Sequence, residues 1–178
     1  MRVLLVSHVG NLYGAGRSLL ALARGLQDAG HEPGVVLPQL GDLSQALSQT
    51  GISYFELACP WWALCPPSSL KVIQWYIRRI ISTSRDLNSL IRRFDPDLVH
   101  TNSSVIPSAA LAARCAQIPH VWHLREFCVE DFGLQFLFGR RMSARLVSWL
   151  SRQVLTISHA VARVYEVRSM ADKLCVVY

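Results

Sequence analysis

The stretch VLLVSHVGNLYGAGRSLLALARGLQDAG, residues 3–30, decides the fold. It begins with four apolar residues, Val3–Val6, as expected for a central parallel strand that is buried on both faces. A loop with three glycines follows, and apolar residues then recur at helical spacing from Ser18 to Ala29, where Gly30 provides a stop. A strand, a loop and a helix in this order predict the first part of a βαβ unit.

The rest of the chain continues this alternation. Apolar or alternating runs predict further strands at 34–37, 53–58, 98–102, 121–124, 154–157 and from Cys175 onward. Helical patterns predict helices at 42–49, 68–94, 107–117, 134–150 and 158–168, with Asp42 and Ser158 as caps. We therefore expect one α/β domain over residues 1–178, with a Rossmann-like, doubly wound and mostly parallel sheet.

Ligands of such sheets bind beyond the carboxyl ends of the strands, which limits where a functional site can lie. The segments at that edge are His8–Arg17, Asn102–Ser104, His123–Glu126 and Ser158–His159. A nucleophilic serine is disfavoured there, because the sequence contains no Gly-x-Ser-x-Gly elbow. The first three segments are therefore the main candidates.

Composition and charge restrict the class of protein. About half of the residues are apolar and 17% are charged, which argues against disorder. The net charge of +6 comes from arginine and permits a phosphate ligand or an acidic lipid surface, whereas nucleic acid is disfavoured because no reader motif occurs. The five cysteines include no Cys-x-x-Cys pair, so we expect reduced, mostly buried thiols in a cytoplasmic protein. No signal peptide or apolar stretch of about 20 residues occurs, which predicts a soluble or peripheral protein.

The glycine loop could hold a phosphate group. Gly14, Ala15 and Gly16 precede a helix, so backbone N–H groups can face an anion there. The dinucleotide fingerprint needs a third glycine where this chain has Leu19, and an acidic residue at the end of the second strand where it has Leu37. A nicotinamide or flavin site is therefore disfavoured, and a plain strand-to-helix turn remains the alternative.

The segment His123-Leu124-Arg125-Glu126 follows the fifth strand. Histidine can transfer a proton or donate a hydrogen bond to a sugar, and arginine offers a planar fork for phosphate. Glu126 could hold Arg125 in place. The alternative is a histidine satisfied by the backbone beside an ordinary Arg–Glu ion pair.

Three histidines raise the question of a metal site: His100, His120 and His123. No carboxylate or cysteine joins them at ligand spacing. Strand alternation also places His120 and His123 on opposite faces of the sheet. We therefore expect no metal.

The helix expected at 68–94 carries an apolar stripe, and its basic residues lie largely off that stripe. This basic side is either a solvated face or a contact with an anionic membrane surface, helped by Trp75 and Tyr76. The proline-bounded loop before it, 59–67, carries two tryptophans, Trp61 and Trp62, which we expect to be exposed.

Six motifs in this order together resemble the N-terminal domain of GT-B-fold, family 4 type retaining glycosyltransferases. They are MRVLLV at 1–6, YGAGR at 13–17, ARGL at 23–26 with GHE at 30–32, DPDLVHTN at 95–102, HLRE at 123–126 and LTISHAV at 155–161. The resemblance covers essentially the whole chain. It implies one half of a GT-B architecture, in which two Rossmann-like domains face each other across a cleft.

The resemblance also implies a reaction and a set of site residues. The C-terminal domain holds a nucleotide-diphosphate sugar, the N-terminal domain holds a glycan or lipid-linked acceptor, and transfer retains the anomeric configuration without metal or cofactor. His123 would be the catalytic histidine that touches the transferred sugar. The residues implied near the diphosphate and the acceptor are Gly14, Ala15, Gly16, Arg17, Asn102, Ser103, Arg125 and Glu126.

The chain departs from the family at its end. It stops at Tyr178, where relatives continue into the donor-binding domain, so we expect that domain to be supplied in cis or in trans. The expected role is the acceptor-binding half of a transferase for cell-envelope polysaccharide, cytoplasmic or peripheral at the inner face of the membrane. The alternative is a non-catalytic binding module or the partner subunit of a split glycosyltransferase.

Overall fold

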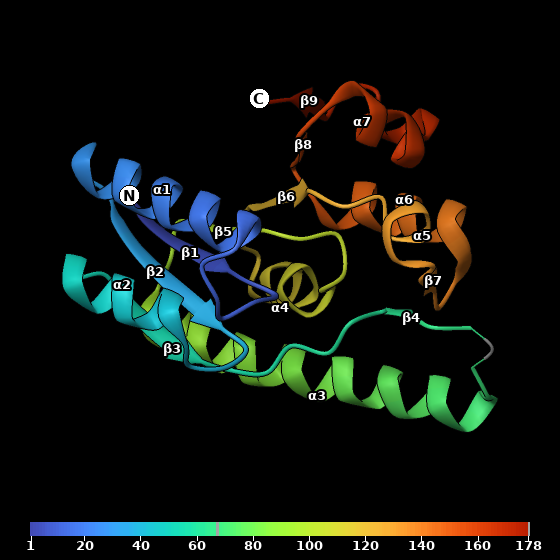
Figure 1. Cartoon of the computed structure of the whole chain (residues 1–178), viewed down its shortest axis with the longest axis horizontal. Helices are drawn as coiled ribbons and strands as arrows, with labels where there is room; N and C mark the ends of the chain where they lie inside the picture. The colour runs from blue at the N-terminus through green and yellow to red at the C-terminus, as the bar shows by residue number, and fades with distance from the viewer. Residues whose placement is uncertain (67, 178) are drawn as a thin grey trace.

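The computed structural model describes residues 1–66 and 68–177, and within them seven parallel strands form one sheet. The sheet order is β3-β2-β1-β5-β6-β8-β9, with every neighbouring pair parallel. The chain moves outward from β1 through β2 to β3, returns to β5 beside β1, and then moves outward on the other side (Figure 1). The strands are β1 Arg2–Val6, β2 Glu32–Leu37, β3 Ser53–Glu56, β5 Leu98–Thr101, β6 His120–Leu124, β8 Gln153–Thr156 and β9 Leu174–Val176. This confirms the doubly wound, Rossmann-like α/β fold.

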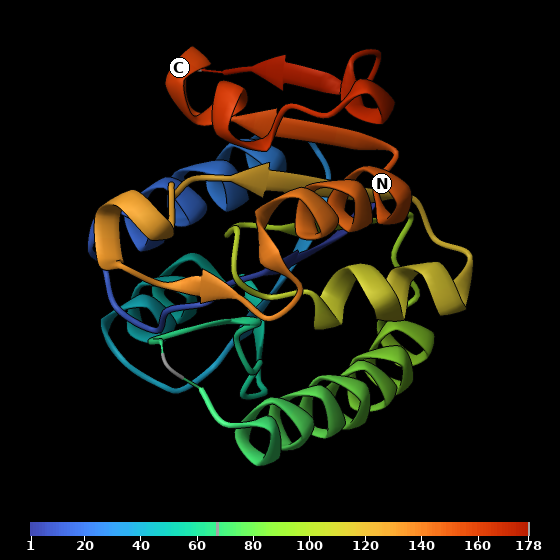
Figure 2. The same ribbon diagram turned by 90° about the vertical axis from the view of Figure 1, so that its right-hand side faces the viewer.

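Helices cover both faces of the sheet. The helices α1 (Gly14–Asp28) and α2 (Asp42–Thr50) pack on one face of β1 and β2. The other face packs against α3 (Leu70–Phe94), α4 (Ser108–Ala116), α6 (Gly139–Leu150) and α7 (His159–Tyr165), which a short 3-10 helix η1 (Arg168–Met170) follows. Figure 2 shows β6, β8 and β9 following one another at one edge of the sheet.

A small second sheet joins two distant loops. The two-residue strand β4 (Ala63–Leu64) pairs antiparallel with β7 (Gln135–Phe136), which the short helix α5 (Val129–Phe132) precedes. The segment that leads to β4 runs beside α3, whose N-terminal half projects past the sheet (Figure 1).

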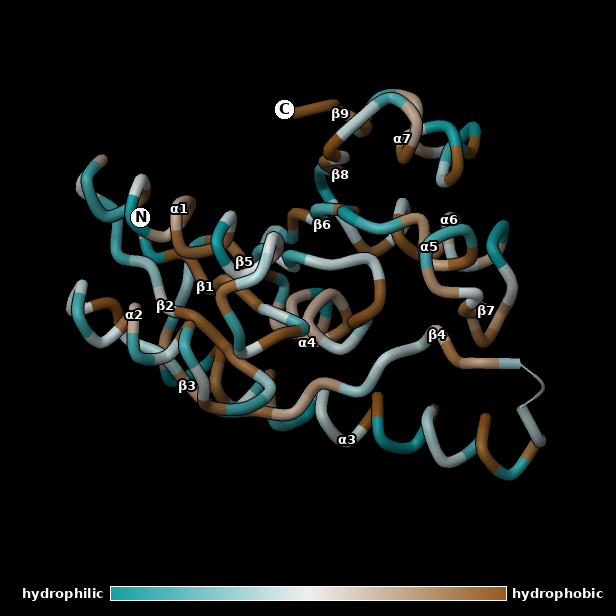
Figure 3. The backbone as a smooth tube through the Cα atoms, viewed as in Figure 1, coloured by the Kyte–Doolittle hydropathy of each residue, from teal (hydrophilic) through white to brown (hydrophobic). Residues whose placement is uncertain are grey.

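The central strand explains why the sheet has two cores. Leu4 and Val6 lie in one apolar cluster and Val3 and Leu5 in the other, because alternate side chains of a strand point to opposite faces. Figure 3 shows the apolar colouring of β1 and β2 between the helices. Burying one such side chain contributes about 1.5–3 kcal/mol, so the two-sided burial of β1 holds both helical layers to the sheet.

Several local predictions are wrong. The helix α1 begins at Gly14 rather than Ser18, so Gly14, Ala15 and Gly16 form its first turn, and a Cβ on Gly16 would overlap the Asn11 carbonyl. The helix expected at 134–150 begins at Gly139, because residues 135–136 are drawn into the small sheet.

Further corrections concern single side chains. Asp42 lies inside α2, whose N-cap is Gly41, and the Gly41 N–H donates to Ser44 Oγ at 3.0 Å. Trp61 is exposed as predicted, but Trp62 is buried: its ring stacks on Trp122 at 5.6 Å, and its indole N–H donates to the Ser104 carbonyl at 2.9 Å. Most of the cysteines are not buried: only two are, and the exposed ones are Cys65, Cys115 and Cys175. Among the described residues, no helix combines the length and the apolar character needed to cross a bilayer.

Gly34→Ala tests the contact between β2 and α3. A Cβ at Gly34 would lie 2.6 Å from Phe94 Cζ, so we expect the change to reduce the free energy of unfolding by about 1–3 kcal/mol in urea titrations. Gly25→Ala is the matched control, because Gly25 lies within α1 and, apart from its chain neighbours and the backbone of its own helix, no heavy atom lies within 4 Å of its Cβ position. The control should stabilise by about 0.5–1 kcal/mol. Equal effects at both positions would contradict this packing.

Candidate functional site

Three of the predicted segments meet at the carboxyl edge of the sheet. The Asn102 amide, just after β5, donates to the Ala15 carbonyl in the first turn of α1 at 3.1 Å. The Arg125 guanidinium, just after β6, donates to Ser18 Oγ in the same helix at 2.9 Å. Residues up to 107 positions apart are thereby joined above the ends of β1, β5 and β6.

Glu126 is the most connected residue at this edge. Its carboxylate accepts the Ser104 N–H at 2.8 Å and the Ser103 hydroxyl at 3.3 Å, and lies 3.5 Å from His8 Nε2. Its backbone carbonyl accepts the Tyr165 hydroxyl at 2.9 Å. The expectation that Glu126 holds Arg125 is therefore wrong: the carboxylate fixes the segments after β1 and β5, and Arg125 is held by α1.

A strained turn follows Glu126. Cys128 has φ 66° and ψ −63°, and the Val129 N–H donates to the Phe127 carbonyl across it at 2.9 Å, which is a γ-turn of the positive-φ form. The Cys128 thiol is buried and accepts the Tyr165 hydroxyl at 3.4 Å, and burial raises the pKa of this thiol to about 12. The turn is held by its surroundings, and it reverses the chain directly after the site.

The histidines divide between the two faces of the sheet. His100 and His123 stack on one face, with ring centroids 5.7 Å apart, whereas His120 lies on the other and binds Thr101 Oγ1 at 2.8 Å. Nε2 of both His100 and His123 is buried without a hydrogen-bond partner in the described part of the chain. Within these described residues no group of His, Cys, Asp or Glu is arranged to hold a metal.

These histidines are neutral at physiological pH. Burial lowers the pKa of His123 to about 4, and the positive charge of Arg125 adds to the effect. Burial also lowers the pKa values of His100 and His120 to about 3. His123 can therefore act as a neutral hydrogen-bonding group, while Arg125 supplies positive charge beside it.

The remaining predicted residues lie apart from this cluster. Arg17 is exposed in the first turn of α1, and its side chain makes no hydrogen bond or ion pair within residues 1–66 and 68–177. Ser158 caps α7 by accepting the Val161 N–H at 3.2 Å, as predicted. Ser104 lies in the predicted segment Asn102–Ser104 but has no predicted role there, and Tyr165 is not predicted at all, because hydrogen bonds between distant segments leave no local pattern in the sequence.

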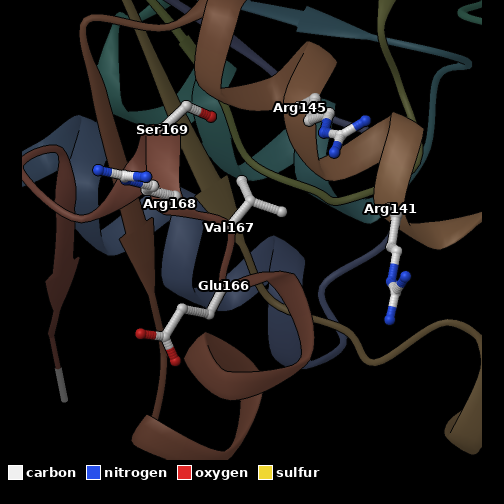
Figure 4. A pocket seen from close by; sticks show the side chains of 6 residues that line it. All are labelled: Arg141, Arg145, Glu166, Val167, Arg168 and Ser169. Carbon is white, nitrogen blue, oxygen red and sulfur yellow. The ribbon is translucent and has the colours of Figure 1, made fainter.

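A separate cavity of about 670 Å³ lies between α6 and the segment that follows α7. Figure 4 shows its three arginines, Arg141, Arg145 and Arg168, with their guanidinium groups pointing away from one another. It shares no residue with the cluster at the carboxyl edge. The carboxyl edge therefore remains the candidate site.

Acidification should destabilise the fold between pH 6.5 and 4. The unfolded chain takes up protons at His100, His120 and His123 near pH 6.5, whereas the folded chain does so only near 3 or 4. The free energy of unfolding therefore falls as the pH is lowered, by at most about 1.4 kcal/mol per pH unit for each histidine. Urea titrations at pH 7, 6 and 5 measure this slope. His100→Leu should make it shallower, and an unchanged slope would contradict the buried neutral state.

The fold and the arrangement at its carboxyl edge define a Rossmann-like domain of the kind found in GT-B glycosyltransferases. Residues 13–178 match the model of Glycosyltransferase Family 4, and the chain belongs to this family. Among curated proteins, none matches the sequence significantly.

Solved structures share the fold at low sequence identity. HepE of Anabaena in complex with UDP is 18% identical, with a TM-score of 0.68 over 100% of this chain and 44% of HepE. MurG of Acinetobacter baumannii is 17% identical, with a TM-score of 0.60 over 87% of this chain and 40% of MurG. A UDP-GlcNAc 2-epimerase of Neisseria meningitidis bound to UDP-GlcNAc is 22% identical, with a TM-score of 0.61 over 99% of this chain and 46% of the epimerase. The chain thus spans less than half the length of these proteins.

Proposed function

We propose that this chain is the acceptor-binding half of a retaining glycosyltransferase, which moves a sugar from a nucleotide-diphosphate sugar to a glycan or lipid-linked acceptor. Its membership of Glycosyltransferase Family 4 supports the class of reaction. The observation that carries the proposal is the meeting of α1, Asn102, Arg125 and Glu126 at one edge, beside His123. HepE and the epimerase, which share this fold, bind UDP or a UDP-sugar.

The start of α1 suits a diphosphate. Its N-cap residue, Tyr13, provides no side-chain hydrogen bond, and the first-turn N–H groups of Gly14, Ala15 and Gly16 have no capping partner within residues 1–66 and 68–177. Free N–H groups and the helix dipole favour an anion there. The Arg125 guanidinium, fixed on Ser18 of the same helix, adds a full positive charge.

In the proposed reaction the acceptor hydroxyl oxygen bonds to the anomeric carbon on the face from which the diphosphate departs, the bond from that carbon to the diphosphate breaks, and the hydroxyl proton passes to the departing diphosphate oxygen. Neutral His123 donates a hydrogen bond to the transferred sugar. Arg125 and the start of α1 stabilise the charge that develops on the leaving diphosphate. Asn102, Ser103 and Glu126 shape the acceptor side. The donor-binding domain is supplied in cis or in trans, and the proposal includes no metal and no cofactor.

We further propose that the protein lies in the cytoplasm, peripheral at the inner face of the membrane, and acts in cell-envelope polysaccharide synthesis. The N-terminal half of α3 supports this placement. Leu70 and Trp75 are exposed there beside Lys71 and Arg78, a combination that suits an interface with anionic lipid.

His123→Ala tests the catalytic role. In the chain acting with its donor-binding domain, we expect the change to lower sugar transfer at least 100-fold while the melting temperature stays nearly constant. His31→Ala is the matched control, because His31 lies just before β2, away from the carboxyl edge, and its loss should leave transfer unchanged. Full transfer by the His123→Ala protein, or its failure to fold, would contradict the proposed role.

A second test asks whether transfer requires the donor-binding domain. The chain as it stands should show no transfer from any nucleotide sugar in a radiolabel assay, because most of the donor site lies in the other domain. Adding a donor-binding domain should restore transfer. Robust turnover by the chain alone would overturn the two-half arrangement, and transfer by neither form would favour the non-catalytic alternative.

A further inference from the structure

A pocket of about 310 Å³ opens beside the candidate site, between α3 and the segment after β3. Its lining residues come from the loop after β2, the segment 58–64 and the exposed half of α3. Those that bear on its chemistry are Pro38, Trp61, Trp75, Tyr76 and Arg79. Because β2 and β3 both end at the carboxyl edge, the pocket lies at the same edge as the cluster around Glu126.

The lining is apolar with one charge. Trp61 and Trp75 expose 39% and 55% of their surface, and Tyr76 packs edge-on against Trp75 at 4.9 Å. The Arg79 guanidinium lies 5.8 Å from the centre of the Trp75 ring. Its side chain makes no hydrogen bond or ion pair with a described residue, and it is the one charged residue of the lining.

Contacts of Trp61 and Trp62 fix the position of the pocket relative to the candidate site. The Trp61 ring lies 6.0 Å from the ring of His8, whose Nε2 is 3.5 Å from the Glu126 carboxylate. The next residue, Trp62, is anchored through its backbone N–H to the Val105 carbonyl at 3.0 Å and through its indole to Ser104. Trp61 is therefore an exposed ring on a fixed backbone, between the pocket and the candidate site.

We propose that this pocket binds the hydrocarbon part of an amphiphilic acceptor, a lipid phosphate. The chain of the lipid lies against Trp61, Trp75 and Tyr76, and Arg79 pairs with the phosphate. This assignment rests on the proposed function and names the acceptor class that the function leaves open. A glycan without lipid would need carboxylate or amide side chains to accept its hydroxyl groups, whereas this lining contains none among the described residues: beside the Arg79 guanidinium it offers the Tyr76 hydroxyl and two indole N–H groups.

Binding of n-decyl phosphate, kept below its critical micelle concentration and without vesicles, tests the assignment by calorimetry. We expect saturable binding to the chain, weakened at least tenfold by Trp61→Ala and by Arg79→Gln. Trp61→Phe, which keeps a ring, should restore most of the affinity. Matched controls outside the pocket are Trp149→Ala on α6 and Arg85→Gln on α3, both at exposed positions, and each should stay within twofold of the parent. Circular dichroism melting confirms that each variant is folded.

Several outcomes would overturn the assignment. These are equal affinity for n-decanol and n-decyl phosphate, equal affinity for inorganic phosphate, and binding insensitive to Trp61→Ala. The binding of a lipid phosphate and the transferase role can be rejected independently of each other. Loss of transfer in the His123→Ala protein with no decyl phosphate binding would keep the transferase and reject the lipid acceptor. Decyl phosphate binding that depends on Arg79, without transfer under any condition, would keep the pocket and reject the transferase.

Discussion

The partly buried carboxylate of Glu126 is the constraint on which the edge of the sheet depends. Moving a carboxylate out of water is costly unless donors replace the lost hydration, and here Ser103, Ser104 and His8 surround it. These donors belong to the segments after β5 and β1, so satisfying one carboxylate fixes three strand ends relative to one another. Tyr165 holds the same residue from α7 through its backbone carbonyl.

The electrostatics of the edge follow from this arrangement. Glu126 is bound to Ser103 and Ser104, and burial keeps His100 and His123 neutral, so the positive charge at this edge comes from Arg125, the exposed Arg17 and the start of α1. The positive charge of Arg125 also lowers the pKa of His123, so the cation helps to keep the histidine neutral. A site of this kind favours an anion next to a neutral polar group, and the proposed diphosphate joined to a sugar has this character.

The sequence was sufficient for the fold and for the segments of the site, because strand and helix periods are local and parallel strand ends share one edge. The sequence did not predict the environment of side chains whose contacts are made by distant segments. The sequence places Trp62 among prolines and so predicts exposure, but the ring is buried against Trp122, which comes from a distant strand. Glu126 reads as the partner of Arg125, its neighbour, yet folding brings it better donors. The positive φ of Cys128 has no signal in the sequence, since cysteine does not favour it.

A row of packed aromatic side chains that ends at Glu126 also connects the candidate site to the pocket beside it. Trp62 stands next to the exposed Trp61, and its ring packs against Phe136 at 5.6 Å. Phe136 packs in turn against Tyr165 at 6.1 Å, and Tyr165 donates to Glu126. The small sheet locks this row, because Ala63 pairs with Phe136. A close-packed row has few alternative arrangements, so the apolar wall and the polar edge keep a fixed distance. An acceptor that spans both is therefore selected by its length as well as by its charge.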